Sequence, residues 1–350
     1  MGILTTTIGA YPKPEFLREQ SFREVAPEGE GTTREFVYSA DDGSDVSVRL
    51  YDEATERAVL DQVGCGIDIP TDGEQRRENY IHYHCRHLDG IRFDVLTEKV
   101  HRNGAAMARL PTITSQIKPR GGHFLHKDFI SAQRVTDKPV KITVPGPATI
   151  ADTTANDFYA DERELAFDLA DALSFEIRHL AEMGCKHIQV DEPLFARNVN
   201  SALNFGVEAL ERCFHKLPKG VTRIMHMCCG YPGHLDDETY LKADPSCYFE
   251  LADAVDASVI DQVSIEDAHR FNDLTLLERF TRSTVVLGVV AIARSRIETT
   301  AEVSARLMNA LQHIDKERLI AAPDCGLMML DRATAMKKLK RMCLAAHGLK

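Results

Sequence analysis

The chain has 350 residues, of which 44% are hydrophobic and 27% are charged, enough for one large α/β barrel or for two ordinary domains. Its formal net charge of −11, without a basic block, argues against nucleic acid as a partner. No apolar run reaches the length of a membrane span, and the first residues lack the basic and apolar regions of a signal peptide, so we expect a cytoplasmic protein with no membrane partner.

Strand-like runs that end in Gly, Pro or Asp alternate with helical stretches along the chain. The eight runs cover residues 3–9, 66–71, 140–145, 187–192, 222–228, 261–266, 284–291 and 318–323. Between them, residues 161–183 carry apolar side chains at helical spacing, and 299–313 opens with Thr299, Thr300 and Glu302, which is typical of a helix start. Eight strands that alternate with helices predict an α/β protein with a single (β/α)8 TIM barrel spanning residues 1–350.

Two insertions interrupt this alternation. The first, from about 11 to 50, follows the first strand and is rich in polar and turn residues, which indicates loops and a hairpin. The second, from about 73 to 139, follows the second strand and holds the histidine-rich run from His82 to His87. We expect this second insertion to reach over the barrel mouth. The sequence shows no repeat beyond the β/α alternation and no low-complexity linker, so we do not divide the chain into domains.

The fifth strand carries His226 and Cys228 two residues apart. Side chains i and i+2 of a strand share a face, so the imidazole and the sulfur converge while Cys229 points away. A thiolate and an imidazole together suit Zn²⁺. Glu266 at the end of the sixth strand and Cys325 after the eighth are the candidates for the remaining ligands. The alternative interpretation is a buried histidine beside a buried free cysteine.

In a (β/α)8 barrel the chemistry lies at the C-terminal ends of the strands. The polar residues at those ends are Thr6, Thr7, Asp72, Glu74, Asp191, Glu192, His226, Cys228, Glu266, Asp267 and Cys325. We therefore expect them to ring one mouth of the barrel. The nine cysteines show no framework of spacings, so we expect thiols rather than disulfides, and Cys65, Cys185, Cys213 and Cys343 read as packing residues.

Six motifs together resemble the catalytic domain of cobalamin-independent methionine synthase, from about residue 4 to 345. They are Thr5-Thr-Thr-Ile-Gly-Ala-Tyr-Pro, Asp72-Gly-Glu74, Gln189-Val-Asp191-Glu-Pro193, His226-Met-Cys228, Ser264-Ile-Glu266 and Pro323-Asp-Cys325-Gly326. The resemblance implies a zinc barrel that activates a small-molecule thiol, such as homocysteine, for methyl transfer in methionine biosynthesis. It implies these metal ligands: His226, Cys228, Glu266 and Cys325. It also implies that the thiol substrate is held by the backbone of Ile8 and Gly9 and by Glu74 and Asp191.

Zinc coordination fits this chemistry because it holds a thiol, with a free pKa of about 8.5, as a thiolate at neutral pH. Zinc has no redox chemistry of its own and tolerates ligand exchange. We hypothesise that Glu266 is the ligand that yields to the substrate sulfur, since an oxygen donor is the least matched to a metal that already holds two thiolates.

Three features depart from the family pattern. Full-length synthases carry a second, N-terminal barrel that helps to bind the folate polyglutamate tail, for which 350 residues leave no room. Ala10 stands where the family has Ser, and Ala293 stands where the seventh-strand motif Asp-x-His-Ser-Pro has its proton-donating His. A folate amine leaves poorly without a proton, whereas a corrinoid leaves as Co(I) without one. We therefore expect inefficient use of methylfolate and consider a corrinoid or corrinoid protein as the alkyl donor.

A general acid could come from elsewhere in the chain. His269, after the sixth strand, is our first candidate, and we assign the catalytic roles to His269 and Asp191. A second candidate group consists of His82, His84 and His87. The alternative interpretation is that these histidines lie on the surface or pack in the interior without a catalytic role.

Other functions remain open at this stage. Thiol alkylation of the epoxyalkane:coenzyme M transferase type would use Arg294 or Arg296 as a sulfonate clamp, unless both lie on a solvated loop. A barrel related to uroporphyrinogen decarboxylase needs no zinc, and the His-x-Cys pair argues against it. A zinc-stabilised barrel without catalytic activity and a homo-oligomeric assembly are both compatible with the sequence.

Overall fold

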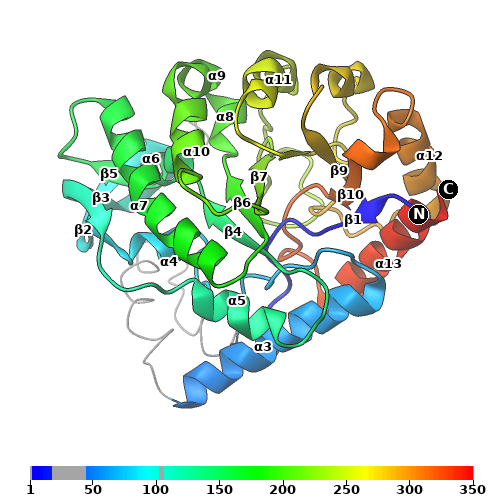
Figure 1. The fold of residues 1–350 in the computed structure, drawn as a ribbon, viewed down its shortest axis with the longest axis horizontal. Helices are drawn as coiled ribbons and strands as arrows, with labels where there is room; N and C mark the ends of the chain where they lie inside the picture. Colours follow the sequence, from blue (N-terminus) through cyan, green and yellow to red (C-terminus); the bar gives the residue numbers. More distant parts are fainter. Residues whose placement is uncertain (1, 18–44, 102–105, 350) are drawn as a thin grey trace.

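The computed structural model describes residues 2–17, 45–101 and 106–349. A curled parallel sheet of seven strands forms the centre of the molecule, in the order β1-β10-β9-β8-β7-β6-β4 (Figure 1). The strands are β1 (Leu4–Thr5), β4 (Lys141–Pro145), β6 (His187–Asp191), β7 (Thr222–Met227), β8 (Gln262–Ile265), β9 (Thr284–Val290) and β10 (Leu319–Pro323). Apart from Leu4, their side chains are buried or half-buried, as expected for a sheet covered on both faces.

The remaining position of the barrel is filled by residues 69–71, between the edge strands β1 and β4. Parallel bridges pair Thr6 with Ile69 and Thr71 with Lys141, and the Lys141 N–H donates to Pro70 O at 2.8 Å. Pro70 has no N–H to donate, which explains why this segment makes single bridges instead of the predicted strand over 66–71. The eight positions follow the chain order, which confirms the predicted (β/α)8 barrel.

Helices surround the sheet (Figure 1). They are α3 (Asp45–Cys65), α4 (His82–Cys85), α5 (His126–Gln133), α6 (Pro147–Asp152), α7 (Glu162–Glu182), α8 (Leu194–Arg197), α9 (Val199–Ser201), α10 (Val207–Cys213), α11 (Cys247–Ala257), α12 (Thr300–Ala310) and α13 (Arg332–Gly348). One π-helical turn covers Ala202–Gly206, and 3-10 turns cover Leu274–Arg279 and Lys316–Arg318. Both predicted helices are confirmed as α7 and α12. A capping box between Thr299 and Glu302 begins α12.

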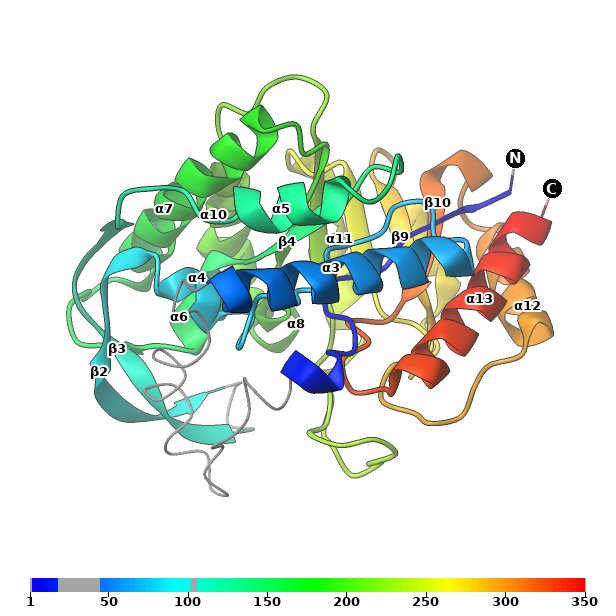
Figure 2. The ribbon, with the colours of Figure 1, turned by 90° about the horizontal axis from the view of Figure 1, so that it is seen from below.

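The first insertion differs from its prediction. Residues 45–50 begin α3, whereas the sequence indicated loops and a hairpin up to residue 50; residues 18–44 of this insertion lie outside the described residues. The buried side chains Tyr51, Ala54, Ala58 and Cys65 recur at helical spacing along α3. Figure 2 shows α3 running beside α5 and α13, and packing against these neighbours stabilises it.

The second insertion forms an antiparallel hairpin of β2 (Leu88–His101) and β3 (Ala106–Pro119), and β5 (Ala155–Asn156) adds to it in parallel. Lys99 Nζ donates to Ala151 O and Thr154 O, both at 2.8 Å, so the hairpin is attached to the segment after β4. From the second insertion, Glu74 and Tyr80, which precede the hairpin, line the cavity described below.

All nine cysteines lie within the described ranges and are free thiols, which confirms that prediction. No helix in the described part of the chain is long and apolar enough to cross a membrane.

Candidate metal centre and substrate cavity

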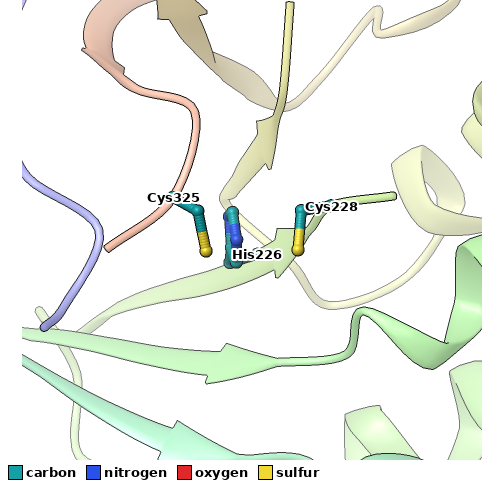
Figure 3. Close-up of side chains that lie close together, drawn as sticks. All are labelled: His226, Cys228 and Cys325. Carbon is teal, nitrogen blue, oxygen red and sulfur yellow. The ribbon is translucent and has the colours of Figure 1, made fainter. Parts of the chain in front are cut away.

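Three side chains that could hold a metal ion converge at the C-terminal end of the barrel (Figure 3). His226 is the fifth residue of β7, Cys228 follows the end of that strand, and Cys325 lies on the loop after β10. Their ligand atoms all lie within 4.8 Å of one another, and within the described ranges this is the one group of three or more such side chains. Cys229 points away, and its sulfur lies 3.5 Å from the Tyr248 hydroxyl. The alternation of strand β7 thus places His226 and Cys228 as the sequence indicated.

The imidazole of His226 is oriented for ligation through Nε2. Its Nδ1 lies 2.9 Å from the Ser264 hydroxyl, because His226 and Ser264 are register partners on β7 and β8. Its Nε2 is buried and makes no hydrogen bond within the described residues. A buried polar atom without a hydrogen bond is unfavourable unless a ligand satisfies it. This atom is therefore available to a metal ion held between the three side chains.

The two thiols of this group differ in acidity, with the pKa of Cys228 lowered and that of Cys325 raised. Their hydrogen bond, together with His226, holds the pKa of Cys228 well below its usual range. The same hydrogen bond and burial raise the pKa of Cys325. Burial lowers the pKa of His226, but the neighbouring Cys228 sulfur and its charge outweigh it, so the net shift is upward. Two sulfurs and one imidazole nitrogen form a donor set that fits Zn²⁺.

Glu266, the fourth predicted ligand, lies beside this group rather than in it. Its Oε2 accepts hydrogen bonds from the Cys229 N–H at 3.1 Å and the Tyr231 hydroxyl at 2.9 Å, and it pairs with Lys242 Nζ at 2.9 Å. Its Oε1 is buried and makes no hydrogen bond within the described residues, although the Arg270 guanidinium lies 3.8 Å away. The residues in these contacts lie on the loop after β7, and the sequence carries no periodic signal that predicts them. Coordination by Glu266 stays a prediction.

A cavity of about 180 Å³ opens onto His226, Cys228 and Cys325. The predicted thiol-binding residues Ile8, Gly9, Glu74 and Asp191 all line it. The rest of the lining, which is mostly apolar or aromatic, consists of Ala10, Tyr80, Pro193, Tyr231, Ile292, Gly326, Met328 and Met329. The barrel therefore brings the predicted substrate residues and three of the four predicted metal ligands to one place.

Glu74 is fixed in an unusual backbone conformation at the cavity wall. Its φ of 54° lies in the left-handed region, where non-glycine residues are uncommon. Its Oε1 accepts a hydrogen bond from the Thr143 hydroxyl at 2.7 Å and lies 3.5 Å from the Arg77 guanidinium. A Cβ atom at Gly9 would stand 2.4 Å from this oxygen, so the close approach requires glycine there. Burial raises the pKa of Glu74, and Arg77 partly offsets that rise.

Asp191 is the second carboxylate of the cavity. Its Oδ1 accepts a hydrogen bond from Gln189 Nε2 at 2.7 Å. Burial raises the pKa of Asp191 to about 7, against the opposing influence of His226. Two buried carboxylates in one small cavity favour a ligand with a cationic group.

The comparison with known proteins decides the family. The model of the cobalamin-independent synthase catalytic domain matches residues 3–348, nearly the whole chain. The chain belongs to this family. The resemblance inferred from the sequence motifs is thereby confirmed, and the protein is an enzyme of the methionine synthase type, a methyltransferase.

Relatives in the cobalamin-independent synthase family cover almost the full chain. The methionine synthase of Sulfurisphaera tokodaii is 31% identical over 344 residues, which are 97% of this chain and 90% of that protein. The methionine synthase of Thermococcus kodakarensis is 32% identical over 342 residues, with the same two coverages. The structure of a B12-independent methionine synthase from Shewanella sp. W3-18-1, in complex with selenomethionine, has 26% identity and a TM-score of 0.83, covering 99% of this chain and 97% of that one.

Ala293, which stands where the sequence resemblance implies a proton-donating histidine, is buried beside His269. The Ala293 N–H donates to His269 Nε2 at 3.1 Å, and His269 Nδ1 lies 2.6 Å from Asp324 Oδ2. The ring of His269 contacts Tyr231 edge-on and does not line the cavity. Because both ring nitrogens are already hydrogen-bonded, the role of His269 as a general acid would require the side chain to move, and it stays a prediction.

Two other groups of candidate residues, the arginines Arg294 and Arg296 and the histidine run from 82 to 87, lie outside the cavity. The side chain of Arg296 is 63% exposed and forms an ion pair with Glu302, and Arg294 does not line the cavity either. Neither arginine can therefore clamp a substrate anion there in this conformation. Their positions differ from those expected for the epoxyalkane:coenzyme M transferase type, in which the arginines bind a sulfonate.

The histidines of the run from 82 to 87 do not line the cavity either. His82 Nε2 lies 3.3 Å from Thr153 O, and His84 Nδ1 lies 3.0 Å from Tyr80 O. His87 stacks on Phe124 with ring centroids 3.7 Å apart. Burial lowers the pKa values of His84 and His87. The packing interpretation fits these contacts.

Proposed function

We propose that the protein is a zinc-dependent methyltransferase that methylates a homocysteine-like thiol. One observation carries the proposal: His226, Cys228 and Cys325 converge in the same cavity as Glu74 and Asp191. The first three side chains suit a thiophilic metal. The two carboxylates suit the ammonium group of an amino acid. A thiol that also carries an ammonium group satisfies both halves of the cavity.

When bound to these ligands, zinc would supply a stabilised thiolate at neutral pH. The chain contributes orientation and exclusion of water. Ser264 fixes the imidazole of His226, and Ile8 and Gly9 line the cavity together with Asp191. We place the substrate ammonium group between Asp191 and Glu74. Their raised pKa values fall back toward the usual range once this cation replaces the lost solvent.

Glu266 completes the proposed ligand set from its position beside the three ligands. Its Oε1 is the atom available for coordination, since Oε2 is held by Cys229, Tyr231 and Lys242. We propose that Glu266 gives way to the substrate sulfur, because the loop after β7 already provides alternative donors for its carboxylate.

The donor follows from the residues around Ala293. No histidine stands at the family's proton-donating position, and the nearby His269 has both nitrogens hydrogen-bonded. We therefore propose a donor whose leaving group needs no proton, such as a methyl corrinoid, in preference to methyltetrahydrofolate.

X-ray absorption at the zinc edge tests the acceptor directly. Purified protein should contain about one zinc per chain, and addition of L-homocysteine should increase the sulfur coordination of that zinc. An increase with coenzyme M instead would favour the epoxide-opening alternative, which the exposed position of Arg296 and the two cavity carboxylates now disfavour. Zinc that responds to neither thiol would support a structural metal. Zinc content unchanged in His226→Ala, Cys228→Ser and Cys325→Ser would contradict the site itself.

A further inference from the structure

A buried glutamine joins two parts of the cavity wall that are far apart in the sequence. Gln189 lies on β6, two residues before Asp191, so both side chains point to the same face of the strand. Its Nε2 donates to Asp191 Oδ1 at 2.7 Å and to Ile8 O at 2.9 Å. Gln189 is completely buried and does not line the cavity. It touches the proposed substrate residues from behind.

The orientation of this amide is determined by its partners. A backbone carbonyl can only accept, so the NH2 group must face Ile8 O, and its second hydrogen is directed to Asp191. The amide oxygen then faces Lys141 Nζ, 2.6 Å away on the neighbouring strand β4. Lys141 is only 1% exposed, and burial lowers its pKa to about 7. An amine donates to the amide oxygen in either protonation state, so this arrangement persists around neutral pH.

The consequence for Asp191 is a fixed carboxylate. Gln189 occupies Oδ1, and Oδ2 makes no hydrogen bond within the described residues. Oδ2 is thus the atom left for a ligand in the cavity. The same amide holds the carbonyl of Ile8, and both Ile8 and Gly9 line the cavity. One side chain therefore links the Ile8 backbone to the Asp191 carboxylate.

We propose that Gln189, supported by Lys141, is a positioning residue for recognition of the substrate's amino group. This rests on the proposed function, in which Asp191 binds that group. Gln189 would act on the head of the thiol substrate and not on its sulfur, because none of its hydrogen bonds reaches the three metal ligands.

The test compares two thiols in the protein as purified. L-homocysteine carries the amino group, and γ-mercaptobutyrate is the same molecule without it. Gln189→Glu keeps the size of the side chain and an acceptor for Lys141 but can no longer donate to both Ile8 O and Asp191. We expect it to weaken homocysteine binding, measured by calorimetry, by roughly 10- to 100-fold, the effect of one charge-assisted hydrogen bond. Binding of γ-mercaptobutyrate and the zinc content should stay close to wild type.

Gln133→Glu is the matched control, because the Gln133 amide also donates to two carbonyls, Thr136 O and Lys138 O, but lies away from the cavity. Gln189→Asn, which retains the amide on a shorter side chain, should shift the homocysteine affinity in the same direction and covers the case in which the glutamate variant does not fold. A folded Gln189 variant with the wild-type ratio of the two affinities would overturn the positioning role alone. A wild-type protein that binds both thiols equally would overturn the proposed amino-group site, and this inference with it.

Discussion

Removal of the Ser264 hydroxyl should weaken metal binding without touching a metal ligand. The Ser264 Oγ lies 2.9 Å from His226 Nδ1 and is the group that orients the imidazole. Loss of such an outer partner typically lowers metal affinity about 10- to 100-fold. This corresponds to roughly 1.4 to 2.8 kcal/mol. We therefore expect the dissociation constant of zinc in Ser264→Ala to rise by that factor, measured by competition with a chromophoric chelator at neutral pH.

Ser283→Ala is the control for the loss of a buried hydroxyl. Ser264 and Ser283 are both 1% exposed, and the Ser283 Oγ donates to Ile260 O at 3.3 Å, away from the metal ligands. Loss of one hydrogen bond should lower the free energy of unfolding of either variant by about 0.5 to 1.5 kcal/mol. Only Ser264→Ala should change the zinc affinity. Equal zinc affinities in the two variants would refute the argument that Ser264 orients His226.

Three further outcomes are expected. Zinc binding should release a proton, which can be measured by calorimetry in buffers of different ionisation enthalpy. The raised pKa of Cys325 leaves this thiol protonated before zinc binds. The Cys325→Ser variant should therefore release fewer protons per zinc bound. Ala293→His should increase methyltetrahydrofolate-dependent turnover, by at most about 10² to 10⁴; efficient turnover by the unmodified protein would contradict the donor argument. The pKa of His87 is lowered from 6.5 to about 4 by burial, so the native state takes up its proton later than the unfolded chain and stability falls as the pH drops from 6.5 to 4. In urea unfolding, His87→Phe should lose less stability over that range, and an equal loss would contradict the packing role.

Local sequence patterns predicted those helices and strands that a single repeated signal determines. The apolar stripe of α7 and the start signal of α12 predicted both helices. The apolar runs predicted the strands of the barrel, except that Pro70 reduces the second to single bridges. The sequence did not predict the first residues of helix α3, because residues 41–50 combine polar and β-branched residues of weak helix propensity. Packing against α5 and α13, which is not visible in a local pattern, stabilises it.

At the site, the sequence by itself determined which side chains could meet. The two-residue period of β7 joined His226 to Cys228, and the shared polarity of parallel strands brought Cys325, Glu74 and Asp191 to the same end. Only the tertiary structure decided which partner each side chain takes. Hydrogen bonds and ion pairs depend on positions within a few tenths of an ångström, and these are set by irregular loops that carry no periodic signal. For that reason the engagement of Glu266 by Tyr231 and Lys242, the exposure of Arg296 and the support of Asp191 by Gln189 emerge only from the folded chain.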